Sequence, residues 1–285
     1  MCRHGAAGRN GLESSSMARF PGSHFLRNLV ERRNLLYQLV RRDFTQRFVG
    51  SAAGWLWGVI HPLVLLVSWT FVFKVCLRVQ LGPGEMTQNY PLFLFCGFLP
   101  WLLFQDVVQR SASSLLEHQN LITKTIFPAE VVPVSIFLSS LVNHLIALAL
   151  VLGAVGIWEG RLSPMALFLP VYMLFLGLFA IGVAWIVSSL HVYLRDTAQV
   201  LSVVLTFWFW FTPIFITEDR YPRRLHFLIS SNPLALMVRA YRERLLTARW
   251  PRPGELATIA AFGVVVFVAG GLFFRHLKRG FADVL

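Results

Sequence analysis

The chain has 285 residues, of which 56% are hydrophobic and only 14% are charged. Soluble domains carry about 25% charged residues, so this balance argues against an ordinary soluble domain and predicts an integral membrane protein. The net charge is +12, and all but three of the 26 basic residues are arginine. Such an excess indicates nucleic acid or an anionic membrane surface as a partner. The long apolar runs decide for membrane lipids, and we expect no contact with nucleic acid.

Neither the start of the chain nor the cysteines indicate a functional site. Residues 1–26 are interpreted as a disordered extension, and the first 16 lack the apolar core of a secretory signal. The remainder, 27–285, is predicted to be a single transmembrane domain. Cys2, Cys76 and Cys96 lie far apart without metal-ligand spacing, so we expect no disulfide framework and no metal site.

The first expected element is an amphipathic helix over residues 27–49. Its apolar positions share one face of a helical wheel: Leu36, Tyr37, Leu39, Val40, Phe44 and Phe48. Its polar positions lie opposite: Gln38, Arg41, Arg42, Thr45 and Gln46. Asp43 and Arg47 are four residues apart with the acid first, which favours a pair. This pattern predicts a helix that lies flat on the cytoplasmic leaflet.

Six segments are long and apolar enough to cross a bilayer, which takes about 20 residues. They are 55–79, 90–112, 132–158, 164–190, 198–217 and 255–275. Arginines and lysines crowd the flanks before the first segment and after the last, so both termini are expected in the cytoplasm. The predicted fold is therefore an all-α integral membrane domain with six transmembrane helices.

The segment between the last two spans, 218–254, breaks the charge rule, because it should be external and yet is rich in arginine. Its eight arginines are Arg220, Arg223, Arg224, Arg239, Arg242, Arg244, Arg249 and Arg252. Asn232 is expected to cap a helix with Pro233 at its first position. That helix has about 14 residues and is too short to cross. We interpret 222–247 as a re-entrant helical hairpin, with a surface helix on lipid headgroups as the alternative.

Several of these stretches together resemble a known family. They are RRDFTQRFVGSAAGWLWGVIHPL, GFLPWLLFQDVVQRSASSLLEHQNLITKTIFPAEVVPVS, YLRD and NPLALMVRAYRERLL. In this order they are similar to the permease subunits of type-2 ABC exporters, most of all to the branch that exports O-antigen, capsule and teichoic-acid polysaccharides. The resemblance covers about residues 26–278.

The resemblance implies a bacterial inner-membrane subunit that pairs with a second copy of itself and two copies of a cytoplasmic ATPase. Its substrate would be a lipid-linked polysaccharide, with O-antigen first among the candidates. Residues 27–49 would be the interface helix, 113–131 the coupling loop and 222–247 the outer gate. The chain has no GxxxxGK[ST] loop. It is therefore expected to be no enzyme and to hold no cofactor, and ATP and magnesium would be bound by the partner subunit.

Candidate site residues fall into three groups. Docking on the ATPase is expected of Arg41, Arg42, Glu117, Asn120, Leu121, Ile122, Lys124 and Phe127. The alternative for 113–131 is a loop that packs on its own spans.

The translocation path is expected to involve Trp69, Phe98, Trp101, Asp106, Arg110, Phe207, Trp208, Trp210 and Phe211. Aromatic planes stack on the CH faces of sugar rings, whereas rings that merely face lipid are the alternative. Intramembrane ionisable groups favour function. The outer gate is expected to use Asn232, Pro233, Arg239, Arg242 and Glu243.

Other functions stay open at this point. They are a capsule or teichoic-acid exporter, a permease for small lipids or drugs, and an integral membrane glycosyl or acyl transferase. A transferase would need acids or histidines gathered at one membrane face, and the 14 acids here are scattered.

Overall fold

The computed structural model describes residues 33–47, 49–51, 54–82, 84–124 and 127–284, and all regular structure within them is helical. The expected extension over 1–26 and the start of the expected interface helix lie outside these residues. The α-helices are α2 (Arg33–Gln46), α3 (Trp57–Thr70), α4 (Tyr90–Glu117), α5 (Gln119–Lys124), α6 (Val131–Glu159), α7 (Leu169–Tyr193), α8 (Thr197–Phe211), α9 (His226–Ser230), α10 (Pro233–Leu246), α11 (Pro253–Leu277) and α12 (Phe281–Val284). Tighter or wider turns flank them: η1 (Gly54–Leu56), η2 (Phe71–Cys76), η3 (Pro164–Phe168), η4 (Glu218–Arg220), η5 (Arg223–Leu225) and η6 (Lys278–Gly280).

Five helical segments of the described chain are long and apolar enough to cross a membrane. They are Trp57–Cys76, Tyr90–Glu117, Val131–Glu159, Pro164–Tyr193 and Pro253–Gly280. Each matches an expected span to within a few residues, so the prediction of a multi-pass helical membrane protein is confirmed. The first of them changes from α-helix to a wider π-helical turn over Phe71–Cys76.

The expected span over 198–217 is shorter than predicted. Helix α8 ends at Phe211 after 15 residues, which is about 22 Å at 1.5 Å per residue and short of a bilayer core of about 30 Å. Pro213 explains the end, because a proline disfavours helical backbone in the residue before it and has no N–H to donate. Thr212 is accordingly extended, with a ψ of 129°.

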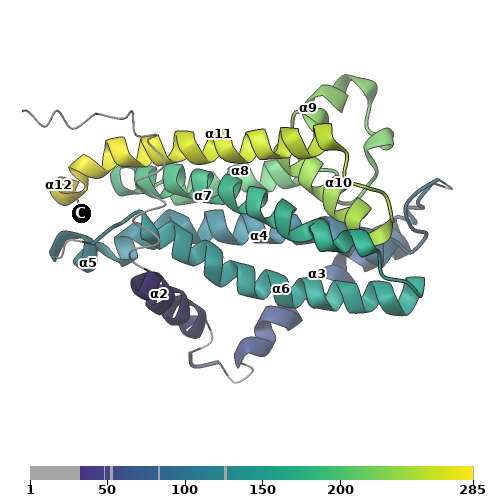
Figure 1. The fold of residues 1–285 in the computed structure, drawn as a ribbon, viewed down its shortest axis with the longest axis horizontal. Coiled ribbons are helices and arrows are strands. Elements are labelled where there is room, and N and C mark those ends of the chain that lie inside the picture. The colour runs from purple at the N-terminus through teal and green to yellow at the C-terminus, as the bar shows by residue number, and fades with distance from the viewer. Residues whose placement is uncertain (1–32, 48, 52–53, 83, 125–126, 285) are drawn as a thin grey trace, which may run out of the picture.

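Helix α4 forms the centre of the bundle, with α6 and α7 beside it, and α11 packs on α7 along the same long axis (Figure 1). Helices α7 and α11 approach through glycines. A Cβ at Gly182 would meet the backbone of Val266 and Phe267, and a Cβ at Gly270 would meet the backbone of Gly182. Backbones that touch in this way are typical of membrane helix pairs, where small residues take the place of a hydrophobic driving force. Helices α7 and α11 are therefore packed closely, backbone against backbone.

Helix α3 stands apart from this bundle, since none of its residues is buried. It carries Pro62 in its interior, and it packs on α4 and α6 without covering them. The space that it leaves beside α4 and α6 becomes the main cavity described below.

The connections gather at two opposite ends of the bundle (Figure 1). Helix α5 and the C-terminal α12 lie at one end, and α9 and α10 lie at the other. At the α12 end, the Lys278 ammonium lies 2.5 Å from the Glu130 carboxylate, which joins the end of α11 to the start of α6. This arrangement places the expected coupling loop and the expected outer gate at opposite ends of the molecule.

Candidate functional site

A cavity of about 590 Å³ lies between α3, α4, α6 and α8. Its wall is aromatic in one part: Trp57, Trp69, Phe98, Trp101 and Phe209. The rest carries polar groups: Arg47, His61, Gln105, Asp106, Gln109, Ser140, Asn143, His144 and Thr206. Sites for organic ligands have this composition, an apolar wall that fills space and a few polar groups that fix orientation.

The aromatic wall is held by contacts between rings of three helices. The ring centroid of Phe209 on α8 lies 5.3 Å from that of Trp101 and 5.9 Å from that of Phe98, both on α4. It lies 6.1 Å from that of Trp69 on α3. The Trp101 indole N–H donates to the Gln105 side-chain oxygen at 2.7 Å. The indole plane is thereby oriented by a residue one turn along the same helix.

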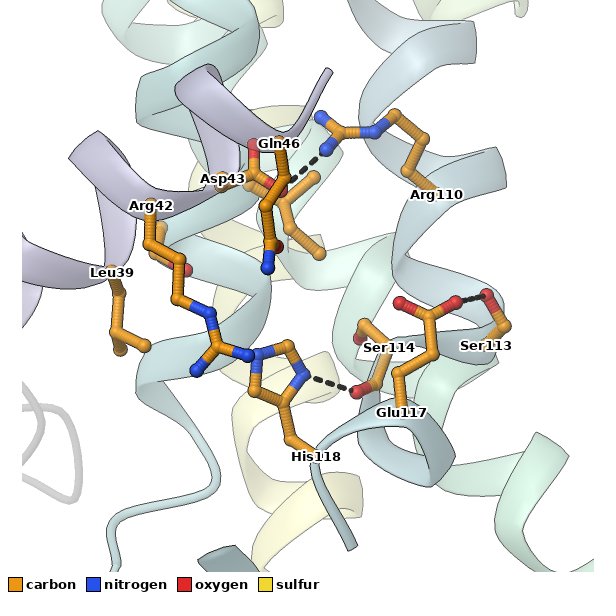
Figure 2. A pocket seen from close by; sticks show the side chains of 11 residues that line it. Leu39, Arg42, Asp43, Gln46, Arg110, Ser113, Ser114, Glu117 and His118 are labelled. Carbon is orange, nitrogen blue, oxygen red and sulfur yellow. Dashed lines mark hydrogen bonds and ion pairs between the residues drawn. The ribbon is translucent and has the colours of Figure 1, made fainter. Parts of the chain in front are cut away.

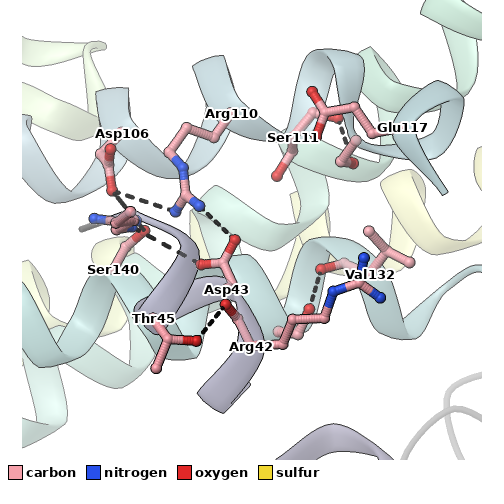
Figure 3. A network of polar contacts seen from close by, with 12 residues as sticks. Arg42, Asp43, Thr45, Asp106, Arg110, Ser111, Glu117, Val132 and Ser140 are labelled. Carbon is pink, nitrogen blue, oxygen red and sulfur yellow. Dashed lines mark hydrogen bonds and ion pairs between the residues drawn. The ribbon is translucent and has the colours of Figure 1, made fainter. Parts of the chain in front are cut away.

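A network of four charges borders the polar part of the cavity. The Arg47 guanidinium, one residue beyond α2, lies 2.7 Å from the Asp106 carboxylate on α4. Arg110, one turn further on α4, lies 2.5 Å from the Asp43 carboxylate on α2 and 4.0 Å from Asp106. Ser140 on α6 donates to Asp106 at 2.6 Å and accepts from Arg47 at 2.8 Å. Figure 3 shows Arg110 between Asp106 and Asp43, with the α2 ribbon passing in front. The network therefore fastens the end of α2 to α4 and α6.

In this network the ion pairs between residues four apart in the sequence are longer than the ion pairs between helices. The Asp43 and Arg47 side chains at the end of α2 are 3.8 Å apart, and the Asp106 and Arg110 side chains on α4 are 4.0 Å apart. The two shortest bridges run between α4 and the N-terminal segment. Sequence spacing alone predicts only the weaker, intrahelical half of this arrangement.

A smaller pocket of about 140 Å³ opens between α2, α4 and α6. Arg42, Gln46, Glu117 and His118 line its rim, and Leu39 and Ile136 line it as well. Figure 2 shows the Arg42 guanidinium directed at the His118 ring, which bonds the Ser114 carbonyl at 2.8 Å. Glu117 accepts from Ser113 at 2.5 Å. Two residues expected at the ATPase interface, Arg42 and Glu117, thus share one pocket.

Of the remaining residues expected at the ATPase interface, Arg41 lies on α2 and the others lie on or near α5. Arg41 and Asn120 are exposed, whereas Leu121 is half-buried. Ile122 and Phe127 pack against the core. Glu117 is the last residue of α4, and the Lys124 side chain and residues 125–126 lie outside what the structure describes. Part of this segment therefore anchors the loop, while Arg41, Glu117 and Asn120 face outward.

Helix α10 begins where the sequence predicts. The Asn232 side-chain oxygen accepts from the Leu234 N–H at 3.0 Å, and Pro233 occupies the first turn. The same oxygen accepts from the Trp208 indole at 3.0 Å. The Asn232 amide donates to the Thr212 hydroxyl at 3.1 Å. This cap therefore also joins α10 to the end of α8.

The charged residues of α10 are paired inside the protein rather than turned to lipid. Arg239 bonds Glu218 at 3.3 Å and lies 4.0 Å from Glu255 on α11. Glu243 is bound by Arg244 at 2.6 Å, and the Arg244 side chain is fully buried. Arg239 and Glu243, which are four residues apart on α10, therefore do not pair with each other, because each has another partner.

Arg242 is also buried, and its guanidinium donates to backbone carbonyls of Phe93, Pro213 and Ile214. These contacts give Arg242 a structural task. A gating role for Arg239 and Arg242 stays a prediction.

The structure sorts the expected path residues into two sets. Trp69, Phe98, Trp101 and Asp106 line the cavity, and Arg110 bonds within its charged border. Trp208 packs on Phe104 in the core, with ring centroids 5.3 Å apart. Phe207, Trp210 and Phe211 are exposed and do not line the cavity. Sequence reasoning missed Phe209, Gln105, Gln109 and the placement of Arg47 at the cavity. The available signal for the two glutamines was their spacing of four residues, which places Gln105 and Gln109 on the same face of the helix.

Comparison with the sequences of known proteins shows the family of this chain. The family model for ABC-2 type transporters matches residues 34–246. The chain belongs to this family. It is 30% identical to the O-antigen export system permease protein RfbA of Myxococcus xanthus, over 90% of this chain and 98% of that protein. It is 28% identical to RfbA of Klebsiella pneumoniae, over 88% and 95% of the two chains. It is 20% identical to the polysialic acid transport protein KpsM of Escherichia coli, over 83% and 91%.

As a member of this family the chain is a transporter membrane subunit rather than an enzyme. All five helices that could cross a membrane lie within or next to the matched region. The matched residues include every residue that lines the cavity, on its charged side and on its aromatic side.

Proposed function

We propose that this chain is the permease subunit of an ATP-driven exporter that moves a lipid-linked polysaccharide, O-antigen first among the candidates, across the bacterial inner membrane. Two observations carry the choice of substrate class. The relatives that are 28–30% identical are named for O-antigen export, and the cavity joins aromatic planes to amides and hydroxyls. Sugars present CH faces for the planes and hydroxyls for the polar groups.

The proposed assembly contains two copies of this chain and two copies of a separate ATPase. ATP and magnesium belong to the ATPase, because the sequence has no glycine-rich phosphate loop. The surface at Arg41, Arg42, Glu117 and Asn120 would meet it, since these residues lie around one pocket or face outward at the α5 end.

The proposed topology has six crossings with both termini in the cytoplasm. The short α8 would be completed by the non-helical residues 212–217, whose carbonyls receive hydrogen bonds from Arg242. Irregular backbone at membrane depth is tolerated where the protein satisfies its polar groups. Helices α9 and α10 would then form the re-entrant hairpin at the outer side.

Complementation tests the proposal. The chain and its ATPase subunit are expressed in a bacterium whose own O-antigen export permease has been deleted, and surface O-antigen is measured against the amount retained inside. Restored surface polymer is expected. A strain with an intact ATPase but no permease is the control. Polymer that stays inside despite normal amounts of both subunits would contradict export of this substrate class.

A further inference from the structure

We propose that Arg47 is the anion-binding residue of the cavity. A phosphate-type headgroup in the cavity would bind Arg47 in place of Asp106. The end of α2 would then be held less firmly to α4. This inference rests on the proposed function, because it gives the charged part of a lipid-linked substrate a place in the same cavity.

The position of Arg47 suits an anion. Both Arg47 and Asp106 line the cavity, and their side chains are 16% and 36% exposed. One guanidinium nitrogen of Arg47 donates hydrogen bonds to both Asp106 and Ser140. Its buried Nε has no hydrogen-bond partner. An arginine fork binds phosphate oxygens through two parallel N–H groups, so a phosphate would satisfy a donor that Asp106 leaves unused.

The border charges allow such an exchange. Arg47 and Arg110 are balanced by Asp43 and Asp106, so the four residues have no net charge to repel an anion. Arg110 also has a buried nitrogen without a hydrogen-bond partner, and it lies at 4.0 Å from Asp106. Asp106 could therefore turn to Arg110 when a phosphate occupies Arg47. After the exchange the phosphate would contact Arg47, and Arg110 would be shared by Asp43 and Asp106, so each acidic group keeps a guanidinium neighbour while the site gains net negative charge.

The exchange would change how α2 is held. Two bridges fasten the end of α2 to α4: Arg47 to Asp106 and Arg110 to Asp43. Losing the first would weaken this attachment while the packing of α2 on α6 remains. Since the exposed face of α2 carries Arg41 and Arg42, a headgroup in the cavity would alter the surface proposed for the ATPase. A ligand shifts an equilibrium only through such a difference in its contacts.

Binding to the complete complex tests the site. The chain and its ATPase are reconstituted in phosphatidylcholine nanodiscs and titrated with geranylgeranyl diphosphate, geranylgeraniol or inorganic diphosphate. Arg47→Gln should weaken binding of the isoprenyl diphosphate by about tenfold or more, the loss of one hydrogen bond to a charged group. It should leave binding of the alcohol unchanged. Asp106→Asn should tighten binding, because it removes the competing carboxylate.

A matched control is Arg195→Gln, which removes an exposed arginine from the connection between α7 and α8. It should bind the diphosphate as the parent does. Wild-type affinity in Arg47→Gln, or weaker binding in both Arg47→Gln and Asp106→Asn, would overturn the proposal. The second result would mean that the pair only maintains the fold.

Two further arms separate the sources of the phosphate and the consequence for α2. Competition by phosphatidylglycerol nanodiscs would assign the site to bilayer lipid, and equal binding of inorganic diphosphate would assign it to free phosphate. Spin labels on Thr45→Cys and Gln119→Cys should move apart when the isoprenyl diphosphate is added, and an unchanged distance would overturn the loosening of α2. Failed complementation with intact diphosphate binding would contradict polysaccharide export and leave the anion site standing.

Discussion

The guanidinium of Arg242 on α10 lies 3.6 Å from the centre of the Phe93 ring on α4. The same group donates to the Phe93 carbonyl at 3.1 Å and to the Pro213 carbonyl at 2.8 Å. A Cβ at Gly97 would collide with this guanidinium, so the glycine makes room for it. Arg242 thus joins the centre of the bundle to the break that follows α8.

Replacing Arg242 should destabilise the protein more than it alters gating. Arg242→Gln leaves three backbone carbonyls without their donor, and each unmade buried hydrogen bond costs about 1–3 kcal/mol. Arg242→Lys keeps the charge but cannot reproduce the fork. We expect both variants to lower the unfolding temperature in detergent and the amount of inserted protein.

Arg239→Gln is the matched control, because Arg239 is a third exposed and pairs with a similarly exposed Glu218. Such pairs contribute about 0–1 kcal/mol. Because Arg239 also lies 4.0 Å from the buried Glu255, the unfolding temperature of Arg239→Gln should fall, but by less than that of Arg242→Gln. Its export activity then reports on the gate. Parent-like stability in Arg242→Gln would contradict the structural task assigned to Arg242.

The glycine contact between α7 and α11 should be intolerant of a methyl group. Gly182→Ala and Gly270→Ala each place a Cβ against backbone that cannot rotate away. We expect a lower unfolding temperature for both, measured on purified protein. Gly153→Ala on α6 meets nothing within 4 Å and should be neutral or stabilising by up to about 1 kcal/mol, because alanine favours a helix. Equal effects of all three would mean that helix propensity, not packing, governs these sites.

The sequence predicts features that depend on neighbours in the chain. The apolar runs predict the crossing helices, and Asn232 with Pro233 predicts the start of α10 because capping is local. The sequence does not predict the end of α8, because residues 212–217 are apolar enough to continue a span. Only Pro213 signalled the break, and hydropathy does not register its missing N–H.

Features that depend on distant residues could not be read in this way. Arg47 and Asp106 are 59 positions apart, and spacing within one helix favours other pairs. Which ring of the aromatic run on α8 faces the cavity depends on the rotation of that helix against α4. That rotation is fixed by packing such as Phe209 on Trp101, so Phe209 and not Phe207 lines the cavity.

Two neighbouring rings on α8 should therefore differ in their effect on export. Phe209→Ala removes a ring from the cavity wall and should reduce surface polymer several-fold at equal protein amount. Phe209→Trp should retain most of it, because a plane for stacking remains. Phe207 is exposed and outside the cavity, so Phe207→Ala should export like the parent. If Phe207→Ala fails as strongly, the path extends over the outer face of α8, as the sequence alone suggests.

The α5 end should control coupling to the ATPase. Asn120 is exposed and Glu117 lines the rim of the smaller pocket. The double variant Glu117→Arg with Asn120→Arg should leave the subunit inserted but reduce ATPase stimulation and export together. Phe127→Ala serves as a contrast, since Phe127 packs on the core and its loss should lower stability as well. Normal ATPase stimulation in the double variant would show that docking does not use this surface.

The six-crossing topology can be tested with single cysteines and a membrane-impermeant thiol reagent in intact cells. In a background with Cys2, Cys76 and Cys96 replaced by serine, Gln88→Cys in the connection before α4 should be labelled from outside. Gln119→Cys on α5 should react only after the membrane is opened, because the two connections lie at opposite ends of the membrane-crossing helix α4. Both positions are exposed in the fold.

Ala248→Cys decides between the two arrangements of α8. If α8 and residues 212–217 together cross the membrane, Ala248 is external and labels in intact cells. If α8 ended inside the bilayer and returned, Ala248 would be cytoplasmic and would label only after opening, and this result would contradict the placement of α10 at the end opposite α5 (Figure 1). Since α11 then crosses the membrane once, the C-terminus must lie opposite Ala248, and a protease-cleavable tag after Leu285 provides the independent check. Labelling of Ala248→Cys together with an external tag would contradict a single crossing by α11, and an external tag alone would contradict the six-crossing topology.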